Sequence, residues 1–283
     1  MAEENHLQAL AEALAARFAD AADLDAGLDV SPGAQAAESL ARLAARGSVR
    51  EFSDAPVDPG LLRLLSALAL ATPTKSDLQQ RDIVLVTDPG LREALNALLA
   101  DQPWTAGAPA LLVFCGNNRR QRLLHQYRGR PFANDHLDAF FNAAVDAGIA
   151  LAGYVAAAEA LGLGCCPISA LRNDPDEVSR LLGLPDHVFP VAGLAVGWPA
   201  RAPVVTPRLP LAVTLHENRY GEEGLEAAIA AYDRRRPYAK QRHVEDFGED
   251  PAYGWSEDKA RQYARPERAG FGAFVRRKGF SLD

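Results

Sequence analysis

The sequence predicts a protein of the mixed α/β or α+β class. Three apolar runs, residues 83–86, 110–114 and 188–196, have the length and composition of buried strands. Stretches typical of helices lie between them, and the longest covers residues 138–161 and ends at Gly162, a usual helix stop. Because strands and helices alternate along the chain, both are expected in one core.

Local signals place the remaining helices. They are expected over residues 6–18, 34–46, 57–70, 91–99 and 176–182. Asp58, which follows a Pro-Val turn, is the expected N-cap of the third of these, and an Asp-Pro-Gly turn at 88–90 closes the first strand. Residues 20–32 carry Asp, Gly and Pro and predict a link between the first two helices.

The composition divides the chain into three segments. Residues 1–33 are expected to form an N-terminal helical extension, and residues 34–210 a catalytic core. Residues 211–283 are polar, Arg-rich and aromatic, with few apolar runs. Such a tail rarely folds alone, so we expect it to wrap a partner surface, namely a second copy of the chain.

Charge and hydropathy exclude several classes of protein. The 283 residues carry a net charge of −7, which argues against nucleic-acid and membrane-surface binding because both need clustered positive charge. The N-terminus lacks the pattern of a signal peptide. Asp146 and Glu159 interrupt the apolar stretch 139–163, which favours a buried helix over a membrane span.

The cysteines indicate a reducing, cytoplasmic location. Cys115 is isolated and Cys165 and Cys166 are adjacent, so they form neither a metal-ligand spacing nor a disulfide framework. We interpret the adjacent pair as small core residues rather than a redox pair.

Four short segments have the residue types of a binding site. Arg46 and Arg50 bracket Ser48 just past a helix end, and guanidinium and hydroxyl groups suit phosphate; the alternative is a solvated helix terminus. Residues 72–80 crowd hydroxyls and amides onto one loop, which suits a polar heterocycle; the alternative is a well-capped turn.

The third and fourth segments are turns. Residues 162–168 contain Gly-Leu-Gly, but they follow a helix and lack a third glycine in register, so they are not a dinucleotide fingerprint. The remaining interpretation is a turn whose backbone another group can approach closely. Arg208 lies in the proline-stiffened segment 206–210, whose alternative interpretation is a surface linker.

No side-chain constellation for acid–base, nucleophilic or metal chemistry is apparent. The six histidines lack zinc-ligand spacing, and neither a Gly-x-Ser-x-Gly elbow nor a Walker loop occurs. Phosphate and heterocycle recognition without catalytic side chains indicates an enzyme whose cofactor supplies the reactive atom.

Taken in order, the four segments resemble the nitroreductase family, and most closely its NADPH-linked branch of oxygen-insensitive nitroreductases and bacterial flavin reductases. Residues 46–57 are similar to the family's His-Arg-Ser-Ile-Arg-x-Phe-x-x-x-Pro-Ile stretch. Residues 162–173, then 181–185 and 193–199, resemble its second hallmark. The Pro-Arg-Leu-Pro at 207–210, with the His-Glu-Asn-x-Tyr that follows, resembles a feature of that branch, and the similarity covers about residues 40–283.

The resemblance implies an α+β fold: a three-layer α-β-α sandwich with a mixed, mainly antiparallel central sheet and an extended C-terminal tail. It further implies FMN bound at the interface of an intertwined homodimer, with NADPH or NADH as electron donor. The core 34–210 would then be the FMN-binding part, and 211–283 would wrap the dimer partner.

The resemblance also implies roles for individual residues. Those expected at the FMN phosphate and ribityl chain are Arg46, Gly47, Ser48, Arg50, Thr206 and Arg208. Those expected near the flavin ring are Thr74, Lys75, Gln102, Trp104 and the backbone of Pro167, Ile168, Ser169 and Ala170. Arg268 is expected to contact NADPH, and no metal is expected.

The sequence departs from the family pattern at these same segments. Gly47 replaces a usual arginine and Thr206 a lysine, each of which removes a phosphate contact. Ser169 and Ala170 stand where glycines are common. Lys75, beside Asp77, either places a cation near the N1–C2 edge of the flavin or points to solvent.

The implied reaction is a ping-pong transfer of two electrons from the nicotinamide cofactor through FMN to nitroaromatic, quinone or flavin acceptors. Two alternatives remain open. One is a dedicated flavin-dependent reductase or dehydrogenase of a specific pathway substrate, which the changes at Lys75 and Asp77 would serve. The other is a non-catalytic flavin-binding protein.

Overall fold

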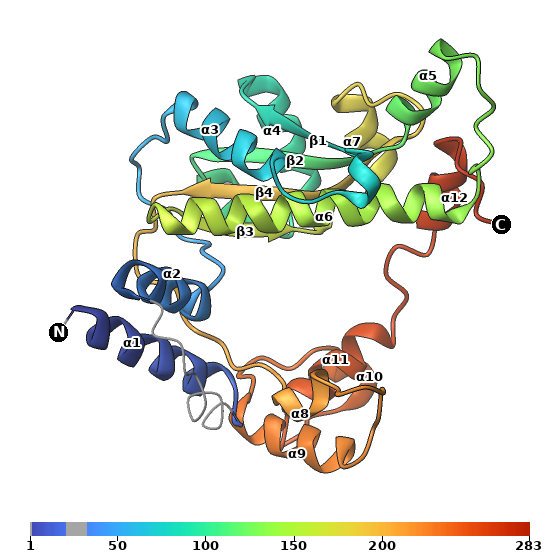
Figure 1. Ribbon diagram of the computed structural model, residues 1–283. Coiled ribbons are helices and arrows are strands. Elements are labelled where there is room, and N and C mark those ends of the chain that lie inside the picture. Colours follow the sequence, from blue (N-terminus) through green and yellow to red (C-terminus); the bar gives the residue numbers. More distant parts are fainter. Residues whose placement is uncertain (1, 21–32) are drawn as a thin grey trace. The chain divides into compact units, whose positions relative to one another are not determined.

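The computed structural model describes residues 2–20 and 33–283, which form two compact units (Figure 1). The sheet unit comprises residues 48–203 and 268–283, and the terminal unit comprises the described parts of 1–47 together with 204–267. These bounds differ from the three segments expected from composition, because the N-terminal extension groups with most of the C-terminal tail and the end of the tail joins the sheet.

The sheet has four strands in the order β1-β2-β4-β3. They are β1 (Arg81–Val86), β2 (Ala110–Asn117), β4 (Val188–Gly197) and β3 (Gly164–Ile168). All three strand pairs are antiparallel, in agreement with the expected mainly antiparallel sheet. The central position of β2 follows from its register, in which Leu112 lies opposite Leu85 on one side and Leu194 on the other.

The three expected strands are confirmed, and β3 is a strand where a turn was expected. Its sequence, Gly-Cys-Cys-Pro-Ile, gives little strand signal because glycine and proline are rare inside sheets. An edge strand tolerates Pro167, since the missing N–H costs no ladder bond on the open side. The adjacent cysteines are therefore core residues of β3: both are buried, and both are unoxidised.

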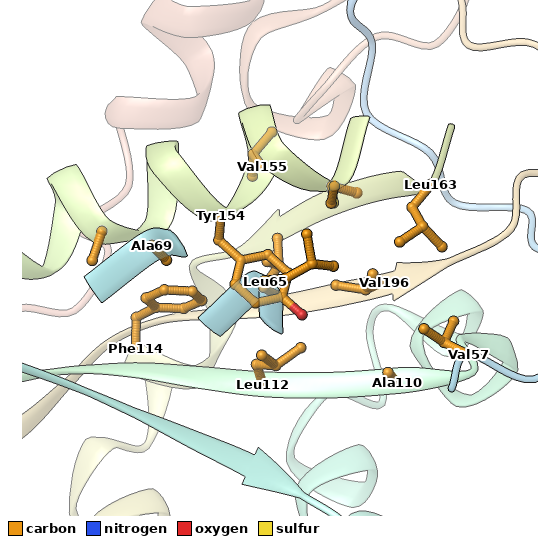
Figure 2. Packing of buried hydrophobic residues seen from close by; sticks show 14 residues of the cluster. Val57, Leu65, Ala69, Ala110, Leu112, Phe114, Tyr154, Val155, Leu163 and Val196 are labelled. Carbon is orange, nitrogen blue, oxygen red and sulfur yellow. The ribbon is translucent and has the colours of Figure 1, made fainter. Parts of the chain in front are cut away.

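Two layers of helices cover the sheet, which confirms the three-layer sandwich. On one face α3 (Pro59–Leu70) and α6 (Leu137–Ala160) enclose a cluster with Leu112 and Phe114 of β2 (Figure 2). On the other, α4 (Pro89–Leu98) and α7 (Pro175–Leu181) pack on Leu111 and Val113. Since alternate residues of a strand face opposite sides, β2 is apolar on both faces and wholly buried.

The expected helices agree with the structure to within about two residues at their ends, except that α1 begins at Ala2, four residues before its expected start. They include α1 (Ala2–Arg17) and α2 (Gly33–Ala45). The carboxylate of Asp58 accepts a hydrogen bond from the N–H of Leu61 at 3.0 Å, which confirms it as the N-cap of α3. The expected link over residues 20–32 lies, from residue 21 on, outside the described residues.

Helix α5 (Arg119–Tyr127) and the helices of the C-terminal tail were not expected, because their sequences are polar on most faces. The tail helices are α8 (Leu211–Thr214), α9 (Leu225–Arg235), α10 (Val244–Phe247), α11 (Trp255–Tyr263) and α12 (Phe271–Arg277). Helix α12 packs on the sheet unit through a cluster that contains Phe274, Phe280, Phe189 and Ala139.

One described helix, α6, is long and apolar enough to cross a membrane by length and composition alone. It packs against the sheet through Ala143, Ala147, Ala150 and Tyr154, none of which is exposed. This is the position of a core helix, as the sequence predicted.

Candidate functional site

The segment after α2 lies against the edge strand β3. The N–H of Val49 donates to the carbonyl of Cys165 at 3.0 Å, and the Val49 side chain is buried. Gly164 makes this approach possible, since a Cβ there would come within 2.7 Å of the Cβ of Val49. Because Val49 points inward, its neighbours Ser48 and Arg50 are exposed beside β3.

A short helical segment, η3 (Pro103–Gly107), lies next to Arg50 through its residue Trp104. The guanidinium of Arg50 lies over the ring of Trp104, 5.8 Å from the ring centroid. Trp104 is half-buried against the cluster that underlies α4, and Gln102 caps η3. The structure therefore brings Arg50, two residues after Ser48, into contact with Trp104.

The C-terminal end of β3 and the two residues after it contain the expected site residues 167–170. Pro167 and Ser169 are exposed, whereas Ile168 and Ala170 are buried. Arg268 reaches this end: its Nε donates to Asn173 Oδ1 at 2.9 Å, and its Nη2 lies 3.4 Å from Ser169 Oγ. A residue far away in the sequence is thus placed beside the strand expected to face the flavin.

Thr74 and Lys75 lie on a separate loop between α3 and β1, and its backbone is strained. Ser76, Asp77 and Gln79 have φ angles of 49°, 55° and 52°, in the left-handed region that non-glycine residues rarely adopt. Such conformations persist only where the surroundings hold them, and they are common at ligand-binding sites.

Asp146 of α6 holds this loop. Its buried carboxylate accepts the N–H of Lys75 at 3.0 Å and the N–H of Gln80 at 2.9 Å. Arg81 Nη1 lies 4.0 Å from it, and Arg81 Nη2 donates to the carbonyls of Leu70 and Thr72. The sequence reasoning missed this role, although a lone carboxylate inside an apolar helix was its signal.

The Lys75 ammonium is paired rather than directed only to solvent. Its Nζ lies 3.3 Å from Asp138 Oδ2, with both side chains about half exposed. Hydrogen bonds from Asn142 and then from Lys75 lower the pKa of the Asp138 carboxyl, which keeps it ionised. Any charge that Lys75 presents to a ligand is therefore partly balanced.

The remaining expected residues lie in the terminal unit. Arg208 Nη1 donates to Thr206 Oγ1 at 2.8 Å, and Arg46 is half-buried past the end of α2. Both segments are tied to Arg17 of α1: its guanidinium donates to the carbonyls of Arg46 and Thr206, and its carbonyl accepts the N–H of Arg208. Arg17 is a second residue that the sequence reasoning missed.

The donor set fits FMN. Guanidinium and hydroxyl groups at Ser48, Arg50 and Arg208 suit a phosphate and a ribityl chain, and a flat edge strand beside Trp104 suits a planar ring. An α+β sandwich with Ser48, Arg50 and Trp104 beside its edge strand has the features of a flavoprotein.

The chain belongs to the nitroreductase family. The family model described as "Nitroreductase family" matches residues 43–198, and that described as "Nitroreductase family, C-terminal domain" matches residues 206–283.

Known proteins agree with this assignment. The FMN reductase [NAD(P)H] of Bacillus subtilis is 32% identical over 251 residues, which are 87% of this chain and 99% of that protein. The oxygen-insensitive NADPH nitroreductase of Salmonella typhimurium is 37% identical over 66% of this chain and 76% of its own length. The solved structure of NfrA2 from B. megaterium has a TM-score of 0.79 at 30% identity, covering 87% of this chain and 98% of that one.

Proposed function

We propose that this chain, an FMN-dependent NAD(P)H oxidoreductase, works by a ping-pong mechanism with nitroaromatic, quinone or flavin acceptors. The observation that carries the proposal is the docking of Val49 on Cys165, which sets Ser48 and Arg50 along the edge strand beside Trp104. Relatives with the printed names FMN reductase [NAD(P)H], NADPH nitroreductase and NADPH-flavin oxidoreductase support the activity.

FMN, when bound, supplies the two-electron chemistry. The chain would bind and orient it: Arg46, Ser48, Arg50 and Arg208 would hold the phosphate and ribityl chain, and Thr74 and Gln102 would contact the ring. The backbone of residues 168–170 would lie beside the ring, where Pro167 has no N–H to offer. Arg268, which lies near Ser169, would bind the nicotinamide cofactor. No side chain serves as acid, base or nucleophile.

The first test is an anaerobic titration of the purified protein with NADPH and then with NADH, followed at the flavin absorption band at about 450 nm. Bleaching at about 1 per second or faster is expected with at least one donor, a rate typical of enzymes. Bound flavin that neither donor bleaches would contradict the NAD(P)H-linked activity and favour a flavin store or a substrate oxidase. Fast bleaching followed by turnover with only one acceptor would instead favour a dedicated pathway enzyme.

A homodimer is also part of the proposal. Several exposed residues of α6 are apolar: Leu137, Phe141 and Val145 are 48%, 60% and 41% exposed. Exposed Leu64 and Leu68 lie on α3, which packs beside α6. Monomers rarely leave so long an apolar face uncovered. We propose that a second copy covers this face, with residues 211–267 contacting the partner, in the cytoplasm.

Phe141→Glu is expected to weaken the dimer by about 2 kcal/mol or more, because it buries an unpaired charge in an apolar interface. Light scattering after size-exclusion chromatography, over a dilution series, measures the effect. Tyr127→Glu, at an exposed aromatic residue of α5 outside the proposed interface, is the matched control and is expected to change nothing. A Phe141→Glu variant that remains as dimeric as the control would show that this face is not the interface.

A further inference from the structure

The last turn of α1 inserts a buried arginine between two chain segments. Arg17 is only 7% exposed. Its Nε donates to the carbonyl of Ala44 at 2.8 Å, its Nη2 to the carbonyl of Arg46, and its Nη1 lies 3.4 Å from the carbonyl of Thr206. One planar guanidinium thus joins the end of α2 to the segment that carries Arg208.

The first of these carbonyls, that of Ala44, belongs to the last turn of α2, and the second, that of Arg46, belongs to the segment that follows the helix. The last carbonyls of a helix have no partner within the helix, and a basic side chain is well suited to satisfy them. Arg17 therefore fixes the path along which the chain leaves α2, and Arg46 is the first residue of that path.

The backbone of Arg17 fixes the other segment. Its carbonyl accepts the N–H of Arg208 at 2.6 Å. Three residues further on, the carboxylate of Asp20 accepts the N–H groups of Leu211 and Ala212 at 2.8 and 2.9 Å. Arg208 thus lies on a segment held from both sides by the end of the N-terminal extension.

We propose that Arg17 is a positioning residue, and that the N-terminal extension serves to set the phosphate-binding arginines Arg46 and Arg208 in place. The inference rests on the proposed role of these two arginines at the FMN phosphate. Arg17 itself lies outside the residues, 43–198 and 206–283, that the family models match. In this proposal the extension acts on the phosphate site through backbone geometry, without touching the cofactor.

The test compares two ligands that differ only in the phosphate. The full-length chain, stripped of flavin, is titrated with FMN and with riboflavin well below its melting temperature, and the ratio of the two dissociation constants measures phosphate recognition. Arg17→Met is expected to weaken FMN binding about tenfold and to leave riboflavin binding unchanged. Arg17→Lys, which keeps the charge but reaches fewer carbonyls, is expected to recover part of the loss.

Control variants separate this inference from the function on which it rests. Arg42→Met removes an exposed arginine of α2 that pairs with Glu38, and is expected to leave both affinities unchanged. Arg46→Met and Arg208→Met are expected to reduce the FMN preference directly. If they do so and Arg17→Met does not, the inference is overturned while the phosphate site stands.

Each remaining result of the titrations also decides whether Arg17 is a positioning residue. If neither Arg46→Met nor Arg208→Met changes the ratio, the phosphate assignment fails and the inference fails with it. Equal losses for FMN and riboflavin in Arg17→Met would mean a general loosening of the fold, which overturns the positioning role. If Arg17→Met does not fold, Arg17→Lys and Asp20→Asn take its place, and each is expected to lower the FMN preference selectively.

Discussion

Asp146→Ala is expected to lower the free energy of unfolding by about 3–5 kcal/mol, the usual cost of removing one partner of a buried ion pair. The side chains of Arg81 and Asp146 are 3% and 1% exposed, so the substitution leaves the guanidinium uncompensated. It also leaves the N–H groups of Lys75 and Gln80 without their acceptor. Urea unfolding of the variant and the parent chain measures the difference.

The matched control is Asp176→Ala, which breaks a pair with Arg277 in which both side chains are more than half exposed. Such surface pairs contribute at most about 1 kcal/mol, so this variant is expected to be nearly as stable as the parent. An Asp146→Ala variant no less stable than the control would show that the buried pair does not hold the loop.

The loop itself gives a second measurement for Asp146→Ala. Hydrogen exchange at the amides of Lys75 and Gln80 is expected to be slow in the parent chain and fast in the variant, because both donate to the buried carboxylate. With the carboxylate gone, the left-handed conformations of Ser76, Asp77 and Gln79 lose their support, and we expect FMN to bind more weakly.

Gly164→Ala is expected to disrupt the packing of residues 48–50 on β3, which is made through Val49. The new Cβ would lie 2.7 Å from the Cβ of Val49, and a β-branched side chain cannot turn away from a contact at its own Cβ. The segment must shift, at a cost of about 1–3 kcal/mol in stability. Because Ser48 and Arg50 shift with the segment, FMN affinity is expected to fall in proportion to the loss of stability.

Gly107→Ala is the control for this variant. Gly107 ends η3 near the same site, and a Cβ added there meets no atom within 4 Å. Stability and FMN affinity of both variants are measured by thermal unfolding and flavin fluorescence. Equal behaviour of Gly164→Ala and Gly107→Ala would refute the idea that the close approach of Val49 to β3 builds the site.

Much of the fold could be predicted because its signals are local. The runs at β1, β2 and β4 are apolar for as long as a buried strand requires, and the Asp58 cap and the Gly162 stop mark the ends of α3 and α6. The strand β3 could not be predicted, since Gly-Cys-Cys-Pro-Ile becomes a strand only by pairing with β4. Strand pairing is a property of the partner as much as of the segment.

The candidate site shows the same division. Residue types at 46–50, 74–75, 167–170 and 206–208 predict the binding segments, because phosphate and flavin recognition needs those chemical groups. Arg17 and Asp146 could not be found in this way. Neither is expected to contact the cofactor, and their partners are backbone groups far away in the chain.

By itself the sequence determined the class of fold through its apolar periodicity, and the resemblance of its short motifs to a known family implied the family and the cofactor. Only the tertiary structure decided that Val49 docks on β3, that Arg268 reaches Ser169, and that buried charges hold the binding segments. The reason is physical: a hydrogen bond from a buried charge to a distant backbone group leaves no periodic trace in the sequence, and it exists only once the chain has brought the two together.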